Sequence, residues 1–252
     1  MAKIVVFDSG VGSLSIIKPI QKKVNADIIY FADQKNFPYG TKSVLELKKI
    51  IKSTIDMLEK NFNPDLIIIG SNTPSLLLKK IINKRRIVGV FPPLKEAKTR
   101  TKTKTIAILA TKSVIESNAI QIYIKKNLPT NIKVITINAS PLIELVESGK
   151  FIDNKKLCKN EIIRILSKPL LQNHIDVVTL SSTHLPFLLP FFKQIFPNIT
   201  FLDPGNNIAD KIAKKLKPQN KTRSLTIFAS GNVKDFQTKL SKIGIKNKVR
   251  SL

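Results

Sequence analysis

Short apolar, β-branched runs alternate with amphipathic segments from one end of the chain to the other. The apolar runs are residues 3–7, 27–31, 66–70, 87–91, 105–110, 133–137, 177–180, 199–202 and 225–229. Runs of this length and composition are typical of strands that are buried on both faces of a sheet. Residues 43–60 instead carry apolar side chains every three or four positions, which predicts an amphipathic helix. The alternation predicts a parallel α/β fold with right-handed crossovers.

One segment of the chain is repeated in a recognisable form. Residues 65–73 are similar to residues 176–184: an acidic residue, Asp65 or Asp176, opens an apolar run, and a serine, Ser71 or Ser182, follows six positions later. In both copies a polar tripeptide then leads through a proline into a Leu-rich segment. The repeat predicts two similar α/β halves that meet at the carboxyl ends of their strands.

Three polar loops follow predicted strands, at the edge where open α/β sheets bind ligands. The loop at residues 8–13 contains a Gly-x-Gly, but Ser15 stands where a dinucleotide fingerprint has its third glycine. Its pattern fits a plain strand-to-helix turn and an anion-binding loop equally well. A single loop of the Ser71 or Ser182 kind is explained by helix capping, whereas two copies at equivalent positions favour a shared site.

The candidate acid–base groups are few. His184 follows Ser182 by two residues at a predicted strand end, where an imidazole can act as a general acid or base. Ser182, His184 and Asp8 could in principle form a hydrolase triad, but there is no Gly-x-Ser-x-Gly elbow and the first two are too close in sequence. Glu144 and Glu147 share a helix face, where charged side chains are ordinarily solvent exposed.

Composition limits the class of protein. The chain has 252 residues, 42% of them hydrophobic, which suits one large domain or two compact ones. A single cysteine, Cys158, excludes an intramolecular disulfide, and with only two histidines it argues against a Cys/His zinc site. We therefore expect no metal. No apolar run approaches the length of a membrane span, and Asp8 interrupts the N-terminal apolar run, so we expect a cytoplasmic protein without membrane association.

The net charge is strongly positive: 43 basic minus 17 acidic residues gives +26. Such a chain attracts polyanions at low salt. The lysines are spread along the whole chain, however, and aromatic residues are only 6% of it. This pattern favours solvated helix faces over a dedicated nucleic-acid site. We expect nucleic acid to bind only weakly, without sequence preference and with strong dependence on salt.

Several of these segments together resemble the glutamate racemase family, within the cofactor-independent Asp/Glu racemase superfamily. The matching pieces are residues 7–12 (FDSGVG), 30–33 (YFAD), 38–43 (PYGTKS), 72–73 (NT), 145–149 (LVESG), 183–186 (THLP) and 203–205 (DPG). They occur in the family's order and extend over most of the chain. The resemblance implies two pseudosymmetric α/β domains with the active site in the cleft between them and no cofactor. The first domain would comprise residues 1–95 plus 208–252, and the second residues 96–207.

The resemblance also implies roles for individual residues. In the family, two cysteines on opposite sides of the α-carbon remove and deliver the proton; Ser71 and Ser182 stand at these positions here. Asp8 resembles the acidic residue beside the first cysteine, and Glu147 with His184 resembles the groups that assist the second. The positions that resemble the family's ligand-holding residues are Ser9, Pro38, Tyr39, Gly40, Asn72, Thr73 and Thr183.

The two serines leave two hypotheses open. A cysteine thiol has a pKa of about 8.5, whereas a serine hydroxyl ionises far higher and needs an adjacent base. The chain is then either an isomerase that interconverts the enantiomers of glutamate or aspartate, or a non-catalytic carboxylate-binding or regulatory protein with a basic surface. Both hypotheses imply a small acidic amino acid or dicarboxylate as partner, and we expect a homodimer.

Overall fold

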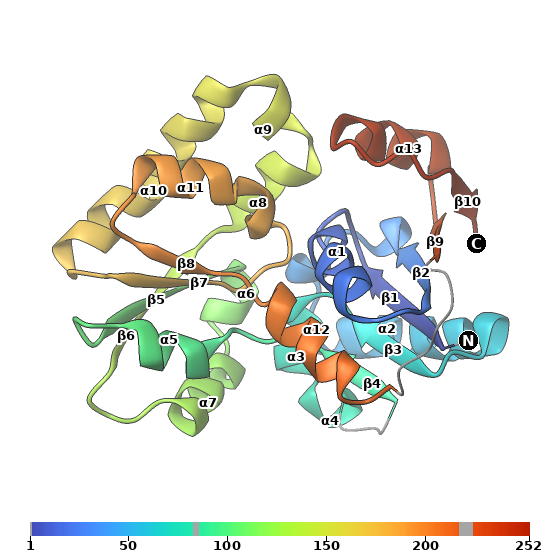
Figure 1. Ribbon diagram of the computed structural model, residues 1–252, viewed down its shortest axis with the longest axis horizontal. Helices are drawn as coiled ribbons and strands as arrows, with labels where there is room; N and C mark the ends of the chain where they lie inside the picture. Colours follow the sequence, from blue (N-terminus) through green and yellow to red (C-terminus); the bar gives the residue numbers. More distant parts are fainter. Residues whose placement is uncertain (1, 83–85, 217–223) are drawn as a thin grey trace.

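The strands form two separate parallel sheets in the computed structural model, which describes residues 2–82, 86–216 and 224–252 (Figure 1). The strands are β1 (Lys3–Asp8), β2 (Asp27–Ala32), β3 (Leu66–Ile69), β4 (Ile87–Gly89), β5 (Thr105–Ala110), β6 (Lys133–Asn138), β7 (Val177–Leu180), β8 (Thr200–Leu202), β9 (Ser224–Ala229) and β10 (Val249–Ser251). The order is β10-β9-β2-β1-β3-β4 in the first sheet and β6-β5-β7-β8 in the second. The predicted parallel α/β class is confirmed, whereas β10 was not predicted.

Helices connect nearly all of these strands. The α-helices are α1 (Leu14–Lys23), α2 (Val44–Phe62), α3 (Asn72–Leu77), α4 (Lys79–Ile82), α5 (Leu94–Arg100), α6 (Lys112–Ile115), α7 (Asn118–Asn127), α8 (Ser140–Glu147), α9 (Lys150–Asp153), α10 (Lys155–Gln172), α11 (Leu189–Ile195), α12 (Gly205–Ala213) and α13 (Val233–Lys242). Short 3-10 helices are η1 (Gln34–Asn36), η2 (Tyr39–Thr41) and η3 (Leu185–Leu188). None of the helices in the described part of the chain is long and apolar enough to cross a membrane.

The two sheets share a four-stranded unit. The order β2-β1-β3-β4 in the first sheet has the same pattern as β6-β5-β7-β8 in the second. The residue after β3, Gly70, donates its N–H to the carbonyl of Phe7 at 2.8 Å, and the residue after β7, Ser181, donates to Leu109 at 2.8 Å. The repeated segments of the sequence therefore occupy equivalent places in the two halves.

The acidic residues that open both repeated segments fasten the start of the neighbouring strand. Asp65 accepts a hydrogen bond from the N–H of Lys3 at 2.8 Å, just where β1 begins. Asp176 accepts from the N–H groups of Lys102 and Thr103 at 2.6 and 3.1 Å, just before β5. Partial burial raises the pKa of Asp176, but the hydrogen bond from the hydroxyl of Thr101 together with these backbone hydrogen bonds outweighs it and holds the pKa below its usual range. The repeat thus encodes the same backbone anchor twice.

The first sheet is covered on both faces, as alternation along β1 requires. Ile4 and Val6 belong to the cluster formed with α1, α12 and α13, and Val5 and Phe7 to the cluster formed with α2. The predicted helix at residues 43–60 corresponds to α2, whose apolar stripe is buried, apart from Val44 at the exposed first turn. Figure 1 shows α1 and α2 on either side of this sheet.

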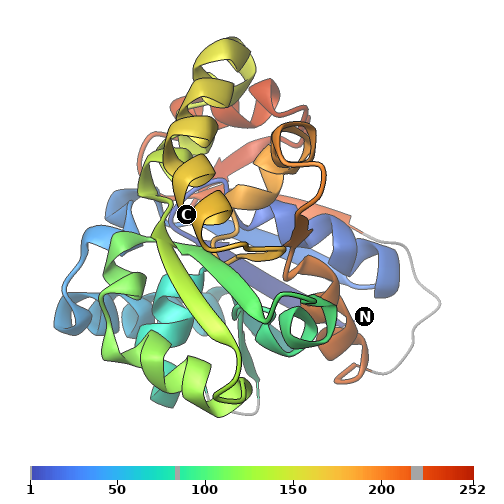
Figure 2. The same ribbon diagram turned by 90° about the vertical axis from the view of Figure 1, so that its left-hand side faces the viewer.

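The second sheet is likewise a central layer between helices. Ala107 and Leu109 of β5 pack in the cluster that contains α10, and Ile106 and Ile108 in the cluster that contains α5 and α7. Figure 2, in which this half faces the viewer, shows α10 on one side of the strands and α5 with α7 on the other.

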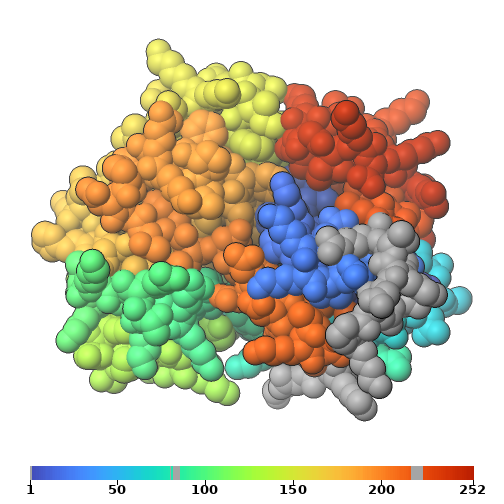
Figure 3. Space-filling view, in the orientation of Figure 1, coloured from blue at the N-terminus to red at the C-terminus, as the bar shows by residue number. Residues whose placement is uncertain are grey.

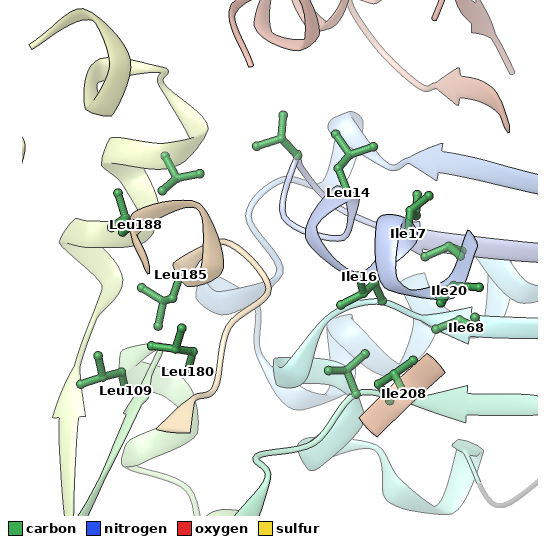
Figure 4. Packing of buried hydrophobic residues seen from close by; sticks show 14 of the residues in the cluster. Leu14, Ile16, Ile17, Ile20, Ile68, Leu109, Leu180, Leu185, Leu188 and Ile208 are labelled. Carbon is green, nitrogen blue, oxygen red and sulfur yellow. The ribbon is translucent and has the colours of Figure 1, made fainter. Parts of the chain in front are cut away.

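One hydrophobic cluster continues from one half into the other. Leu14 and Ile16 of α1 belong to the same cluster as Leu180 of β7 and Leu185 of η3 (Figure 4). The chain crosses between the halves before α5, which packs with the second sheet, and again before α12, which packs against α1. The domain boundaries after residues 95 and 207 fall within these two helices and stay a prediction.

Candidate active site

A cavity of about 680 Å³ lies at the carboxyl ends of strands from both sheets. Its volume is within the range of small-molecule sites. Ser71 and Ser182 both line it, one from each half, although they are 111 positions apart in the sequence. The remaining lining residues are Asp8, Ser9, Phe37, Pro38, Tyr39, Gly40, Thr41, Asn72, Thr73, Thr111, Lys112, Ser113, Glu116, Asn138, Ser140, Ile143, Glu144, Ser181 and His184. The two halves thus contribute to a single site.

Most of the residues predicted for the site line this cavity, and two lie behind it. Glu147 does not line the cavity but contacts His184, and Thr183 does not line it but contacts Asp8. Residues that the sequence analysis did not assign include Thr111 and Asn138. They follow or end β5 and β6, so the strand-end argument used for the other loops could have found them.

Asp8, the last residue of β1, is buried and fully engaged by hydrogen bonds. One carboxylate oxygen accepts from the N–H of Ser9 at 2.7 Å; the other accepts from the hydroxyls of Ser13 and Thr183, each at 3.2 Å. Burial raises the pKa of Asp8 above its usual value, although the His184 charge and these hydrogen bonds oppose it. Because Thr183 belongs to the other half, Asp8 also ties the two loops together.

His184 and Glu147 form a buried pair. The imidazole Nε2 lies 3.1 Å from Oε2 of Glu147, and both side chains are less than 10% exposed. Burial raises the pKa of Glu147, but hydrogen bonding and charge from His184 outweigh it and leave that pKa below its usual value. Burial lowers the pKa of His184, but the Glu147 carboxylate outweighs it and leaves that pKa raised. Each group thus favours the charged form of the other, and the ordinary expectation of solvent exposure for Glu147 is wrong.

The Gly-x-Gly loop after β1 explains how this pair fits. A Cβ on Gly10 would lie 2.2 Å from Oε2 of Glu147, and a Cβ on Gly12 would lie 2.4 Å from Nδ1 of His184. Between them, the N–H of Val11 donates to Oε2 of Glu147 at 2.8 Å. The loop therefore does bind an anion, and that anion is a carboxylate of the protein itself.

Tyr39 is held in place from behind the cavity. Its hydroxyl donates to Asp33 at 2.9 Å, and Asp33 also accepts from Asn36 at 2.9 Å and from Ser230 at 3.2 Å. Burial, followed by the charge of Asp33, raises the pKa of Tyr39 well above its usual value, so the phenol stays protonated. The backbone N–H of Tyr39 donates to the hydroxyl of Ser9 at 3.5 Å. Tyr39 is thus a fixed wall of the site.

Asn72 and Thr73 begin α3 and line the cavity. Asn72 is 3% exposed, and neither its amide nitrogen nor its amide oxygen has a hydrogen-bond partner among the described residues. A buried polar group without a partner costs about 1–3 kcal/mol, so this amide fits a polar ligand in the cavity. Thr73 lies 3.2 Å, hydroxyl to hydroxyl, from Thr111 of the other half.

The hydroxyl groups of Ser71 and Ser182 differ in their hydrogen bonds. Ser71 precedes α3, but its side chain makes no capping hydrogen bond, so helix capping does not explain it. The hydroxyl of Ser182 accepts a hydrogen bond from the N–H of His184 at 3.4 Å. The single cysteine, Cys158, does not line the cavity; it is buried in α10, and burial raises its pKa to about 11.

Comparison with known proteins places the chain among racemases. No protein-family model matches it. The chain is 33% identical over 219 residues to a glutamate racemase of Haemophilus ducreyi, covering 83% of this chain and 80% of that protein. It is 35% identical over 225 residues to a glutamate racemase of Buchnera aphidicola subsp. Schizaphis graminum, covering 83% of each chain.

Solved structures show the same fold. Glutamate racemase RacE1 of Bacillus anthracis superposes with a TM-score of 0.87 at 23% identity, covering 100% of this chain and 97% of that one. The Escherichia coli glutamate racemase, solved with L-glutamate and the activator UDP-MurNAc-ala, gives 0.83 at 22% identity and covers 100% and 98%. Because such identities support the fold alone, the relationship rests on the two closer relatives, and by them the chain belongs to the glutamate racemase family.

Proposed function

We propose that the cavity binds glutamate or aspartate and is arranged for proton transfer at the α-carbon. The observation that carries the proposal is the buried amide of Asn72, which lines the cavity and has no partner among the described residues. An amide of this kind suits a carboxylate or an ammonium group, because it can both donate and accept. Related proteins support an acidic amino acid: the Francisella tularensis glutamate racemase was solved with D-glutamate.

The same site receives an acid–base group from each half of the chain. Asp8 comes from the first half and His184, held by Glu147, from the second. A two-base isomerase needs one group that removes a proton and a second that delivers one to the opposite face. We propose Ser71 and Ser182 as the residues that occupy the positions of the family's cysteines, with Asp8 and His184 as the ionisable groups beside them. Ser9, Pro38, Tyr39, Gly40, Thr73 and Thr183 complete the proposed ligand-holding set.

The serines argue for slow chemistry. A hydroxyl cannot supply the basicity of a thiolate near neutral pH, and general acid–base catalysis typically contributes about 10²–10⁴-fold per group. We therefore propose binding of an acidic amino acid with proton exchange far below the rate of a thiol enzyme. A non-catalytic carboxylate-binding protein is the second candidate, favoured by the same two hydroxyls.

Exchange of the α-proton in deuterated water separates these candidates. The L and D forms of glutamate and aspartate are each incubated with the protein, and loss of the α-proton signal is followed by NMR while calorimetry measures binding. We expect binding together with slow exchange, abolished in the double variant Asp8→Asn with His184→Gln. Binding with exchange no faster than in that variant would favour the non-catalytic candidate. Absence of binding would overturn both.

A further inference from the structure

The C-terminal helix α13, which follows β9 of the first sheet, contributes a side chain that contacts Glu147 in the second half. Its buried residues Phe236 and Leu240 pack in the main hydrophobic cluster, and Asn232 caps its first turn. From this helix the ammonium group of Lys239 lies 3.3 Å from Oε1 of Glu147, which is 92 residues away in the sequence. Figure 3 shows the red C-terminal segment beside the yellow-green segment that contains α9.

The contacts of Glu147 are divided between its two oxygens. Oε2 accepts a hydrogen bond from the N–H of Val11 at 2.8 Å and lies 3.1 Å from Nε2 of His184, whereas Oε1 accepts from the ammonium group of Lys239. The terminal torsion of a glutamate is soft, so contacts to one oxygen alone hold the carboxylate plane loosely. A cation on the second oxygen restricts that rotation. The side chain of Lys239 is one-quarter exposed, so most of its surface is covered by the protein.

A second ion pair crosses the same boundary. Lys242, three positions further along α13, lies 2.6 Å from Asp153 of α9. Its side chain passes close to Gly149, where a Cβ would lie 3.2 Å from Cδ of Lys242. Lys239 and Lys242 thus share one face of α13, but only Lys239 contacts a residue of the site. This provides a matched control for the docking of the helix.

We propose that Lys239 is a positioning residue: by holding Oε1 of Glu147 it directs Oε2 at His184 and so fixes the imidazole proton on Nε2. This leaves Nδ1 of His184 as the nitrogen that gains or loses a proton. The meaning of this arrangement for catalysis rests on the proposed function, but the arrangement itself exists without ligand. The lowered pKa of Glu147, to which the charge of Lys239 contributes, agrees with it.

In the part of the chain that the structure describes, three further titratable groups interact with this unit: Asp235, Asp8 and Tyr30. Asp235 lies 3.4 Å from Lys239 on the same helix and competes for its ammonium group. Asp8 interacts with both His184 and Glu147 through its charge. Burial, followed by the charges of Asp8 and Glu147, raises the pKa of the Tyr30 phenol. Because Lys239 contacts the carboxylate of Glu147 and acts on the imidazole only through it, the site of the proton, rather than a shift of the His184 pKa, is the informative measurement.

NMR of ¹⁵N-histidine-labelled protein tests the proposal without turnover. The chain has two histidines, and a His174→Gln background leaves His184 as the single imidazole signal. With Lys239 intact we expect a protected Nε2–H resonance. In Lys239→Met we expect its exchange with water to accelerate about tenfold, as loss of a hydrogen bond to a charged group implies. Lys239→Arg should retain the protected signal, and so should Lys242→Met.

The outcomes are distinguishable from failure of the proposed function. Unchanged Nε2–H exchange in Lys239→Met would overturn the positioning role, whatever the protein binds. Equal acceleration in Lys242→Met would overturn it too, because the effect would then come from docking of α13. Urea unfolding of each variant checks that it is folded. If Lys239→Met is not, Lys239→Gln replaces it, with the same expectation of faster exchange.

Discussion

The loops that follow β3 and β7 occupy equivalent places in the two sheets, yet the ionisable groups in and beside them differ. After β3 comes Asn72, an uncharged amide, and the ionisable group nearby is Asp8 from β1. After β7 comes His184, an imidazole tied to Glu147. The backbone device is repeated, while the titrating groups are not. The repeat therefore gives the two loops the same backbone position, and the two halves differ in the polar and ionisable side chains that these loops carry.

The ionisable groups of the site also differ in how their contribution to stability depends on pH: Asp8 and His184 respond in one sense and Glu147 in the other. Asp8 has a folded-state pKa raised by burial, so the folded protein loses stability as pH rises through that pKa window. Glu147 has a lowered pKa, so its contribution is present above its unfolded value and lost on acidification. The raised pKa of His184 gives a contribution present below about 6.5 and lost as pH rises through the folded value.

The largest expected effect comes from giving both halves a thiol. The double variant Ser71→Cys with Ser182→Cys should raise glutamate racemisation by roughly 10³-fold, because a thiolate supplies the basicity that a hydroxyl lacks. Circular dichroism of the product mixture measures it. Each single variant should permit exchange on one face at most. A double variant as slow as the wild type would mean that the two positions do not face a common substrate.

The next largest effect should come from removing one carboxylate charge in each half, Glu147 in the second and Asp8 in the first. Glu147→Gln leaves a buried imidazole without its counter-charge, which should lower the free energy of unfolding by about 3 kcal/mol near pH 6. The loss should shrink as the pH rises from 6 through the raised pKa of His184, above which the imidazole is neutral in both proteins. Urea unfolding across this range is the measurement. Asp8→Asn is the counterpart in the first half, and its stability relative to wild type should also increase with pH, beginning above about 4, where the unfolded chain starts to lose this proton.

The smallest effect concerns the amide of the first half. Asn72→Ala should weaken glutamate binding about tenfold, as loss of one hydrogen bond to a charged ligand implies. It should change the free energy of unfolding by less than about 1 kcal/mol, because no described residue depends on this amide. Ser75→Ala, in the same helix, is the control. Its buried hydroxyl accepts from the N–H of Val90 at 3.0 Å, so stability should fall while affinity stays unchanged.

The sequence predicted the layers of the fold well, because both sheets are covered on two faces and their strands are continuous apolar runs. The boundaries of β5 and β7 agree with the pattern to the residue. The strand β10 was not predicted because only Val249 of its three residues is buried, so no apolar run marks it. It forms by pairing with β9, a long-range interaction that local composition does not encode.

The site was predictable only in part. The serine loops were visible as a repeat, since identical offsets from Asp65 and Asp176 reflect a shared backbone anchor. The pairing of His184 with Glu147 was not visible in any local spacing and came from resemblance alone. Lys239 could not be found at all, because it is one of 43 basic residues and only the docking of α13 brings it to Glu147.

The path of the chain between the sheets has a consequence for biosynthesis. The second sheet is built from residues 105 to 202. In the first sheet β2 pairs with β9, so Asp27 can pair with Ser224 only after residue 224 has been synthesised. Domains tend to fold as their residues leave the ribosome. We expect the later-encoded sheet to be complete while the edge of β2 is still unpaired. An open strand edge invites pairing with other chains. The interval before β9 emerges is therefore when a nascent chain most needs protection from aggregation.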